Sequence, residues 1–215
     1  MSAISPAVTT HHPAKTKSGL SNGLMGDMCF LTSEMALFGS LIFMYLYVRR
    51  ASSHWPPEKC VDLVCTPFPG VRPFEWQLPT VNTVILLSSG VTMHFAFQAL
   101  RRGSMRRMYT LLVSTIILGA VFLGGQIYEY HNLITGKNVL TMSSSTYGAT
   151  FFTLTGLHGA HVTGGIIFLL VLLIGTLKGK YNQGNTMVPH AATLYWHFVD
   201  AVWVVLFALF YLTVP

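Results

Sequence analysis

Five long apolar segments, separated by short polar stretches, constrain the fold of this chain more than any other feature. The segments run roughly from 28 to 48, 80 to 100, 108 to 128, 147 to 177 and 190 to 212. A helix needs about 20 residues to cross a hydrocarbon core of about 30 Å, and each segment is long enough. Unsatisfied backbone groups are prohibitive in lipid, and these segments lack the alternation of barrel strands. The sequence therefore predicts an all-α fold, a polytopic transmembrane bundle of five helices.

The charged residues support one membrane domain. Only 9% of the residues are charged, against about 25% in soluble globular domains. A net charge of +6 could suggest nucleic acid, but the basic residues flank the apolar segments instead of lining one face. Nucleic-acid binding is therefore disfavoured. We expect a polar N-terminal segment, residues 1–27, with no signal-peptide pattern, followed by a single transmembrane domain, residues 28–215.

Basic residues between the segments predict the orientation. With the N-terminus inside, the inner stretches hold eight Lys and Arg residues and the outer ones hold five. The short stretch 101–107 carries four arginines and no acid, including Arg101 and Arg102. Because cytoplasmic loops are enriched in Lys and Arg, the N-terminus is predicted to be cytoplasmic and the C-terminus outside.

Glu34 is the most informative ionisable side chain. Such groups at membrane depth cost several kcal/mol unless they are paired or hydrated, so each marks a candidate site. Glu34 lies about six residues from the inner end of the first segment, roughly 9 Å deep at 1.5 Å per residue. Since desolvation disfavours a charged carboxylate, one interpretation is a carboxyl group that accepts protons or contacts lipid. The other is a neutral acid that only hydrogen-bonds to a neighbouring helix.

Two pairs of polar side chains, each three residues apart, occur in the last two segments. His158 and His161 share one helix face and could present two nitrogens to a metal ion. The four glycines around them favour a close helix contact instead, in which the imidazoles form hydrogen bonds between helices. His197 and Asp200 are the second pair. These four side chains make up a predicted polar network inside the membrane, with no metal site.

Other side chains are expected at the membrane interface and against lipid. Glu129 follows Tyr128 at the outer end of the third segment, where water and headgroups would solvate it. Grooves beside the glycine-rich helix predict bound phospholipid, with Trp55 and Trp196 covering acyl chains. Its phosphates would contact cations at helix ends, among them Arg101 and Arg102.

Cofactor and cysteine patterns are weak. The sequence has no Gly-rich phosphate loop, no CxxC pair and no CxxCH haem attachment. His94 is a fourth histidine inside the membrane, besides His158, His161 and His197. A haem ligated by two of these four histidines stays possible. So does a disulfide between Cys60 and Cys65, if their loop faces an oxidising compartment. That loop, residues 52–78, holds five of the ten prolines and is predicted to lack regular structure.

Five sequence motifs are shared with a known family. They are SEMALFG at 33–39, HWPP at 54–57, VNTVILLSSG at 81–90, YGATFFTLTGLHGAHV at 147–162 and YWHFVDAVW at 195–203. With them the chain resembles subunit III of the haem-copper cytochrome c oxidases, in its short five-helix bacterial form. The similarity covers most of the chain after about Leu24.

The resemblance implies an accessory subunit of a proton-pumping terminal oxidase in a bacterial plasma membrane, active in aerobic respiration. It implies no cofactor in this chain other than bound phospholipid, since haem and copper belong to the partner subunits I and II. Cytochrome c or quinol would reach the complex through those chains. Subunit III binds phospholipid and supports proton uptake, and Glu34 matches the family's buried, carbodiimide-reactive carboxylate.

Two other interpretations stay open. The same motifs fit subunit III of a quinol oxidase or of a nitric oxide reductase-like relative, because other chains recognise the electron donor. The second is a free-standing membrane haem or metal protein that uses the histidines. Seven-helix family members have two more spans before the Glu34 motif, and a partner subunit is expected to replace them here.

Overall fold

Five long helices make up the fold. The computed structural model describes residues 22–52, 55, 77–135, 140–143 and 145–213, and the backbone of 59–61 and 64–66. The helices are α1 (Asn22–Ala51), α2 (Gln77–Arg101), α3 (Met105–Thr135), α4 (Thr146–Leu177), α5 (Met187–Phe207) and a π-helical continuation of α5, η1 (Ala208–Leu212). All five long helices are apolar enough to span a membrane, which confirms the predicted all-α transmembrane bundle.

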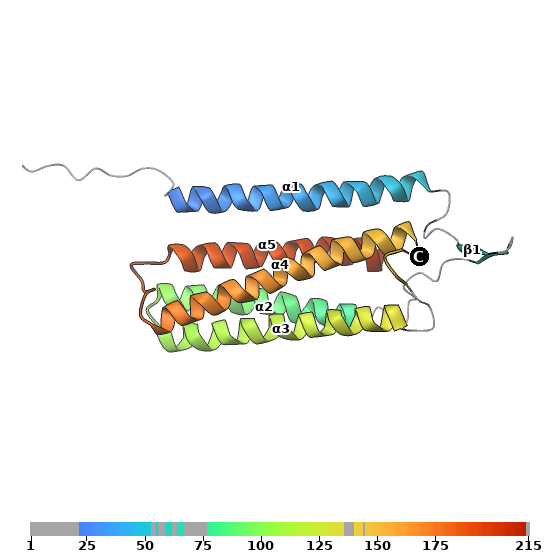
Figure 1. The fold of residues 1–215 in the computed structure, drawn as a ribbon. Coiled ribbons are helices and arrows are strands. Elements are labelled where there is room, and N and C mark those ends of the chain that lie inside the picture. Colours follow the sequence, from blue (N-terminus) through green and yellow to red (C-terminus); the bar gives the residue numbers. More distant parts are fainter. Residues whose placement is uncertain are drawn as a thin grey trace, which may run out of the picture.

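Four of the helices form a compact unit, and α1 lies along one side of it. In Figure 1, α2, α3, α4 and α5 pack closely, whereas α1 runs beside α4 and α5. Only 11% of the most apolar part of α1 is buried within the chain, against 44% for α2 and for α5. The large core cluster accordingly contains side chains from α2 to α5 and none from α1.

Trp196 on α5 connects the four helices. Its side chain is fully buried, and Nε1 donates a hydrogen bond to Ser89 Oγ on α2 over 2.9 Å. A Cβ at Gly119 on α3 or at Gly165 on α4 would lie 2.9 Å from the indole ring. Only glycine leaves room for the ring at these two contacts. The expectation that Trp196 covers lipid acyl chains is therefore wrong, because the residue lies in the protein core.

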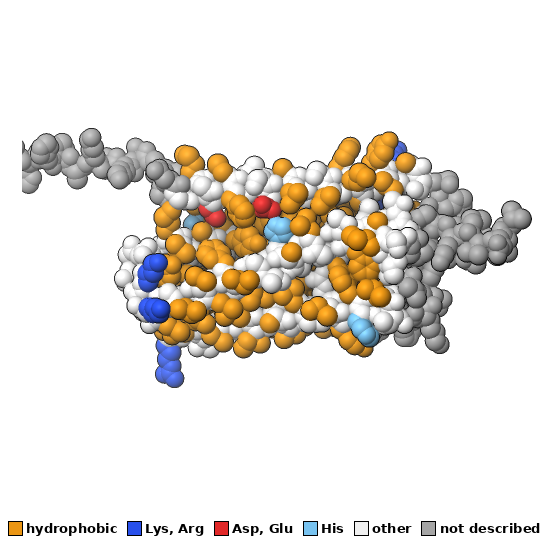
Figure 2. Space-filling model, viewed as in Figure 1, with side chains coloured by type: hydrophobic (Ala, Val, Ile, Leu, Met, Phe, Trp, Pro, Cys, Tyr) orange, Lys and Arg blue, Asp and Glu red, His pale blue; other side chains and the backbone are white. Residues whose placement is uncertain are grey.

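The turns at one end of the bundle are closed by glycines with positive φ. Gly103 has φ 74° after α2, and Ser104 N donates to Ala99 O over 2.9 Å. Gly179 has φ 71° after α4, and Lys180 N donates to Gly175 O over 3.0 Å. This six-residue return is the Schellman helix ending. Lys and Arg side chains gather at this end in Figure 2, and we refer to it as the basic end.

Helix α1 begins earlier than the apolar segment indicated. It starts at Asn22, whereas the hydrophobic pattern predicted residue 28. From Asn22 to Glu34 the helix rises about 18 Å, so Glu34 lies near the middle of α1. Its expected depth of about 9 Å in the membrane stays a prediction.

A short strand pair lies between α1 and α2, where no regular structure was predicted. Strand β1 (Lys59–Val61) runs antiparallel to β2 (Val64–Thr66), and the backbone register places Cys60 opposite Cys65. The cysteine side chains lie outside the described residues. Their disulfide stays a prediction.

Candidate functional site

An acid and a histidine meet between α1 and α4, near the middle of both helices. Glu34 Oε2 on α1 and His161 Nε2 on α4 are 2.8 Å apart. Their side chains are 17% and 15% exposed. In Figure 2, acidic and histidine side chains are visible in the seam between α1 and the other helices. We call this contact the Glu34–His161 pair.

The second ring nitrogen of His161 limits this pair to two arrangements of its protons. His161 Nδ1 lies 2.8 Å from the backbone oxygen of Leu157. A carbonyl oxygen only accepts hydrogen bonds, so Nδ1 carries a hydrogen. Nε2 then either accepts a proton from a neutral Glu34 carboxyl or, as an imidazolium, donates to its carboxylate. In both arrangements one proton is shared between Glu34 and His161, and the pair has no net charge.

Aromatic side chains hold the histidine in place. Phe38 on α1 makes an edge contact with the His161 ring, with centroids 5.0 Å apart. Tyr195 on α5 donates its hydroxyl to the His161 backbone oxygen over 3.0 Å. Helices α1, α4 and α5 thus all contribute to this site.

His158 lies in a different environment from His161. It is fully buried, and neither ring nitrogen has a hydrogen-bond partner in the described part of the chain. Its ring packs against Trp203 and Phe122, with centroids 5.0 and 5.9 Å away. The two histidines therefore do not present their nitrogens to one ligand. The interhelical hydrogen bond expected of both is found only for His161.

His197 and Asp200 lie on the far side of α5, next to α2. His197 Nδ1 and Asp200 Oδ2 are 3.9 Å apart, too far for a hydrogen bond. His94 on α2 joins them, with its ring centroid 6.2 Å from that of His197 and a 2.8 Å hydrogen bond to Gln98. The single polar network predicted from the sequence is thus two separate clusters and one isolated histidine.

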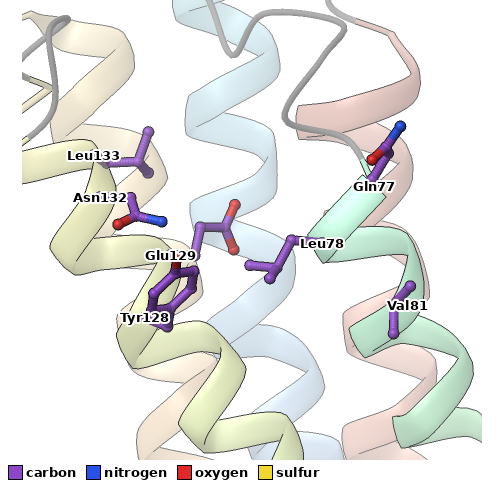
Figure 3. A pocket seen from close by; sticks show the side chains of 7 residues that line it. All are labelled: Gln77, Leu78, Val81, Tyr128, Glu129, Asn132 and Leu133. Carbon is purple, nitrogen blue, oxygen red and sulfur yellow. The ribbon is translucent and has the colours of Figure 1, made fainter.

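Glu129 is largely buried within the chain, and its expected place at the membrane interface stays a prediction. It is 8% exposed, and Tyr211 donates its hydroxyl to Oε1 over 2.6 Å. Helix α3 continues to Thr135, beyond the apolar segment, so Glu129 lies more than one turn before its end. Figure 3 shows its carboxylate directed toward Leu78 of α2, in an open pocket of about 410 Å³.

The remaining predicted site residues lie near the two ends of the bundle. Arg101 and Arg102 are exposed at the basic end. Trp55 is partly buried against Tyr45 and Tyr147, with ring centroids 5.5 and 5.8 Å away. Within the ranges that the structure describes, no three His, Cys, Asp or Glu side chains are grouped to hold a metal ion.

The family model for cytochrome c oxidase subunit III matches residues 3–214, nearly the whole chain. The chain belongs to the cytochrome c oxidase subunit III family. It is 36% identical over 190 residues to the cytochrome c oxidase subunit 3 of Thermostichus vulcanus, covering 88% of this chain and 86% of that protein. It is 35% identical to the subunit 3 of Mammuthus primigenius, over 94% of this chain and 72% of that protein. The probable subunit 3 of Mycobacterium leprae is also 35% identical, with 87% and 86% covered.

As a subunit III family member, the chain is an accessory component of a multisubunit oxidase and a multi-pass membrane protein. Sequence reasoning missed several contacts that build its sites. It did not predict that the hydroxyls of Tyr195 and Tyr211 bond across helices, or that Arg49 donates to both oxygens of Thr213. Tyrosines near apolar helix ends gave no signal, because interfacial tyrosine is common in membrane proteins.

Proposed function

We propose that the chain is the accessory, non-redox subunit III of a proton-pumping cytochrome c oxidase in a bacterial plasma membrane. Its partners are subunits I and II, which hold the haem and copper and receive electrons from cytochrome c. The chain supports proton uptake and stability of the catalytic subunit and binds phospholipid. The basic end faces the cytoplasm, since Arg101 and Arg102 lie there.

The Glu34–His161 pair is the observation that carries this proposal. A net-neutral pair can reside at mid-span at a far lower desolvation cost than a single charge. It can hold a transferable proton there, because the proton moves between Oε2 and Nε2 over 2.8 Å without changing the net charge. Such a site stores or buffers protons and needs no metal or haem.

Carbodiimide labelling tests the proton-holding role. The reagent activates a protonated carboxyl group, so we expect it to modify Glu34 in the intact oxidase. Glu34→Gln should abolish the labelling, leave the haem content unchanged and slow proton uptake only modestly. Glu129→Gln is the matched control and should keep the labelling. Selective modification of Glu129, or loss of haem from the Glu34 variant, would contradict the proposal.

A groove on α1 supports the phospholipid part of the proposal. At the end opposite the basic end, an open groove of about 420 Å³ is lined by Phe43, Leu46, Tyr47, Arg50 and Ala51. A basic side chain above apolar ones suits a phosphate headgroup with its acyl chains. An interfacial Lys or Arg contributes about 1 kcal/mol to such a contact.

Arg50→Gln is expected to release phospholipid from the purified complex. Losing about 1 kcal/mol lowers lipid affinity roughly fivefold, which native mass spectrometry would detect as fewer retained lipids. The control is Arg106→Gln, which removes an exposed arginine at the basic end, away from this groove. Equal lipid retention in both variants would exclude the groove as a binding site.

A further inference from the structure

Two imidazole rings within the transmembrane helices have N–H groups that the described chain does not satisfy. His94 Nε2 on α2 accepts a 2.8 Å hydrogen bond from the side-chain amide of Gln98, so the hydrogen of the neutral ring is on Nδ1. No described residue accepts a hydrogen bond from Nδ1. His197 on α5 is 3.9 Å from Asp200, too far for a hydrogen bond, and no other described residue bonds to its ring nitrogens. Each ring therefore has a donor available for a ligand.

Both rings are accessible from outside the chain. His94 is exposed, and the side chain of His197 is 42% exposed. The ring centroids are 6.2 Å apart. Together with Leu87, Val91 and Phe95, the two histidines line an open groove of about 400 Å³ between α2 and α5. We call it the α2–α5 groove. Its volume and its lining, mostly apolar with a few polar groups, are typical of sites that bind small molecules.

The level of the groove along the helices restricts which molecules can fill it. His94 lies about 10 Å inward from Arg101 at the basic end, and His197 lies about 15 Å inward from Met187. Phospholipid phosphates stay near the cations at helix ends, so they do not reach the two rings. Acyl chains reach them but accept no hydrogen bonds, and an unsatisfied polar group in hydrocarbon is costly. The molecule that fits is apolar and brings a hydrogen-bond acceptor into the hydrocarbon.

We propose that the α2–α5 groove binds the ring of a membrane quinone. Such a ring is flat and largely apolar, and its carbonyl oxygens only accept hydrogen bonds. One carbonyl accepts from His94 Nδ1, His197 supplies a second donor, and the ring packs against Phe95. The isoprenoid tail extends into the surrounding lipid. Binding involves no electron transfer in this chain, and it is independent of the Glu34–His161 pair and of the proposed function.

Photolabelling of the intact oxidase in native membranes tests the site. The probe is a radiolabelled azido-quinone with a decyl tail. We expect an adduct on this chain, at the residues of α2 or α5 that line the groove, and we expect decylubiquinone to compete with the probe. Decylbenzene has the same tail and no carbonyl group, so it should not compete. The absence of an adduct on this chain, as would result from a partner helix in the groove, overturns the inference, and so does equal competition by decylbenzene.

Substitutions of His94 separate ligand binding from folding, because the residue is exposed and surface substitutions change stability little. His94→Leu removes the donor and should weaken the binding of decylubiquinone about tenfold, the upper range for the loss of one hydrogen bond. His94→Gln keeps an N–H donor and should bind within about twofold of the parent chain. His131→Leu is the matched control, since it makes the same change at an exposed histidine of α3 outside the groove. Equal binding in the His94→Leu and His131→Leu variants would refute the site.

Discussion

Trp196→Ala is expected to lower the free energy of unfolding by about 3–5 kcal/mol, the usual cost of removing a large buried aromatic side chain. The indole is fully buried and touches helices α3 and α4 at Gly119 and Gly165. Both neighbours lack a side chain that could move into the cavity. The hydrogen bond to Ser89 on α2 is lost as well. One substitution thus weakens the contacts among four helices.

The unfolding of purified variants in mixed detergent micelles, titrated with a denaturing detergent, measures this effect. Trp196→Phe should cost less, since it keeps most of the volume and loses mainly a hydrogen bond worth about 1 kcal/mol. Tyr128→Ala is the control, because Tyr128 is 59% exposed and surface substitutions stay within about 0.5 kcal/mol. A Trp196→Ala variant as stable as this control would refute the central role of the indole.

Tyr45→Ala is the second substitution with a large expected effect, and it acts on the docking of α1. Tyr45 is fully buried and donates its hydroxyl to Leu209 O over 3.2 Å. Its ring makes edge contacts with Phe210 and Trp55, with centroids 4.8 and 5.5 Å away. Removing a buried aromatic ring costs about 3–5 kcal/mol. Since α1 has few other buried contacts, we expect it to separate from α5 at this end.

Spin labels on the exposed residues Met44 and Ile167 would report this separation. On a cysteine-free background, the distance distribution between α1 and α4 should broaden in Tyr45→Ala. Tyr47→Ala is a matched control, two residues away on the same helix and 66% exposed, and its distribution should stay narrow. Tyr45→Phe should resemble the parent chain. Broadening in the Tyr47 variant alone would contradict this account of how α1 is held.

The number and type of helices could be predicted from the sequence because hydropathy and length alone decide them in a membrane. The glycines of α4 also indicated close contacts, and Gly159 and Gly165 do face Gln126 and the α5 tyrosine and tryptophan. Helix ends were less predictable. Polar residues extend a helix beyond its apolar segment, as at Asn22 and Thr135. These extensions place Glu34 and Glu129 farther from the helix ends than the apolar segments alone indicated.

Which polar groups meet could not be predicted from spacing. Each residue turns the helix by about 100°, so residues three apart are rotated by about 300°. Their side chains therefore point about 60° away from each other around the helix axis. That difference directs His161 to α1 and His158 into the core against Trp203. Trp196 was misassigned because an amphipathic indole suits an interface, and only the two distant glycines and Ser89 reveal its buried position.

The way α1 is attached has a consequence for the order of events during synthesis. Its contacts are with residues far along the chain: Glu34 with His161, 127 residues away, and Tyr45 and Arg49 with Leu209 and Thr213, 164 residues away. Helix α1 leaves the ribosome first, and its last partner leaves near the end of translation. During that interval α1 resides in the bilayer without its native neighbours. Docking of α1 is therefore the final step of assembly, and a chain that stops short of Leu209 lacks the partners of Tyr45 and Arg49 that hold its first helix at that end.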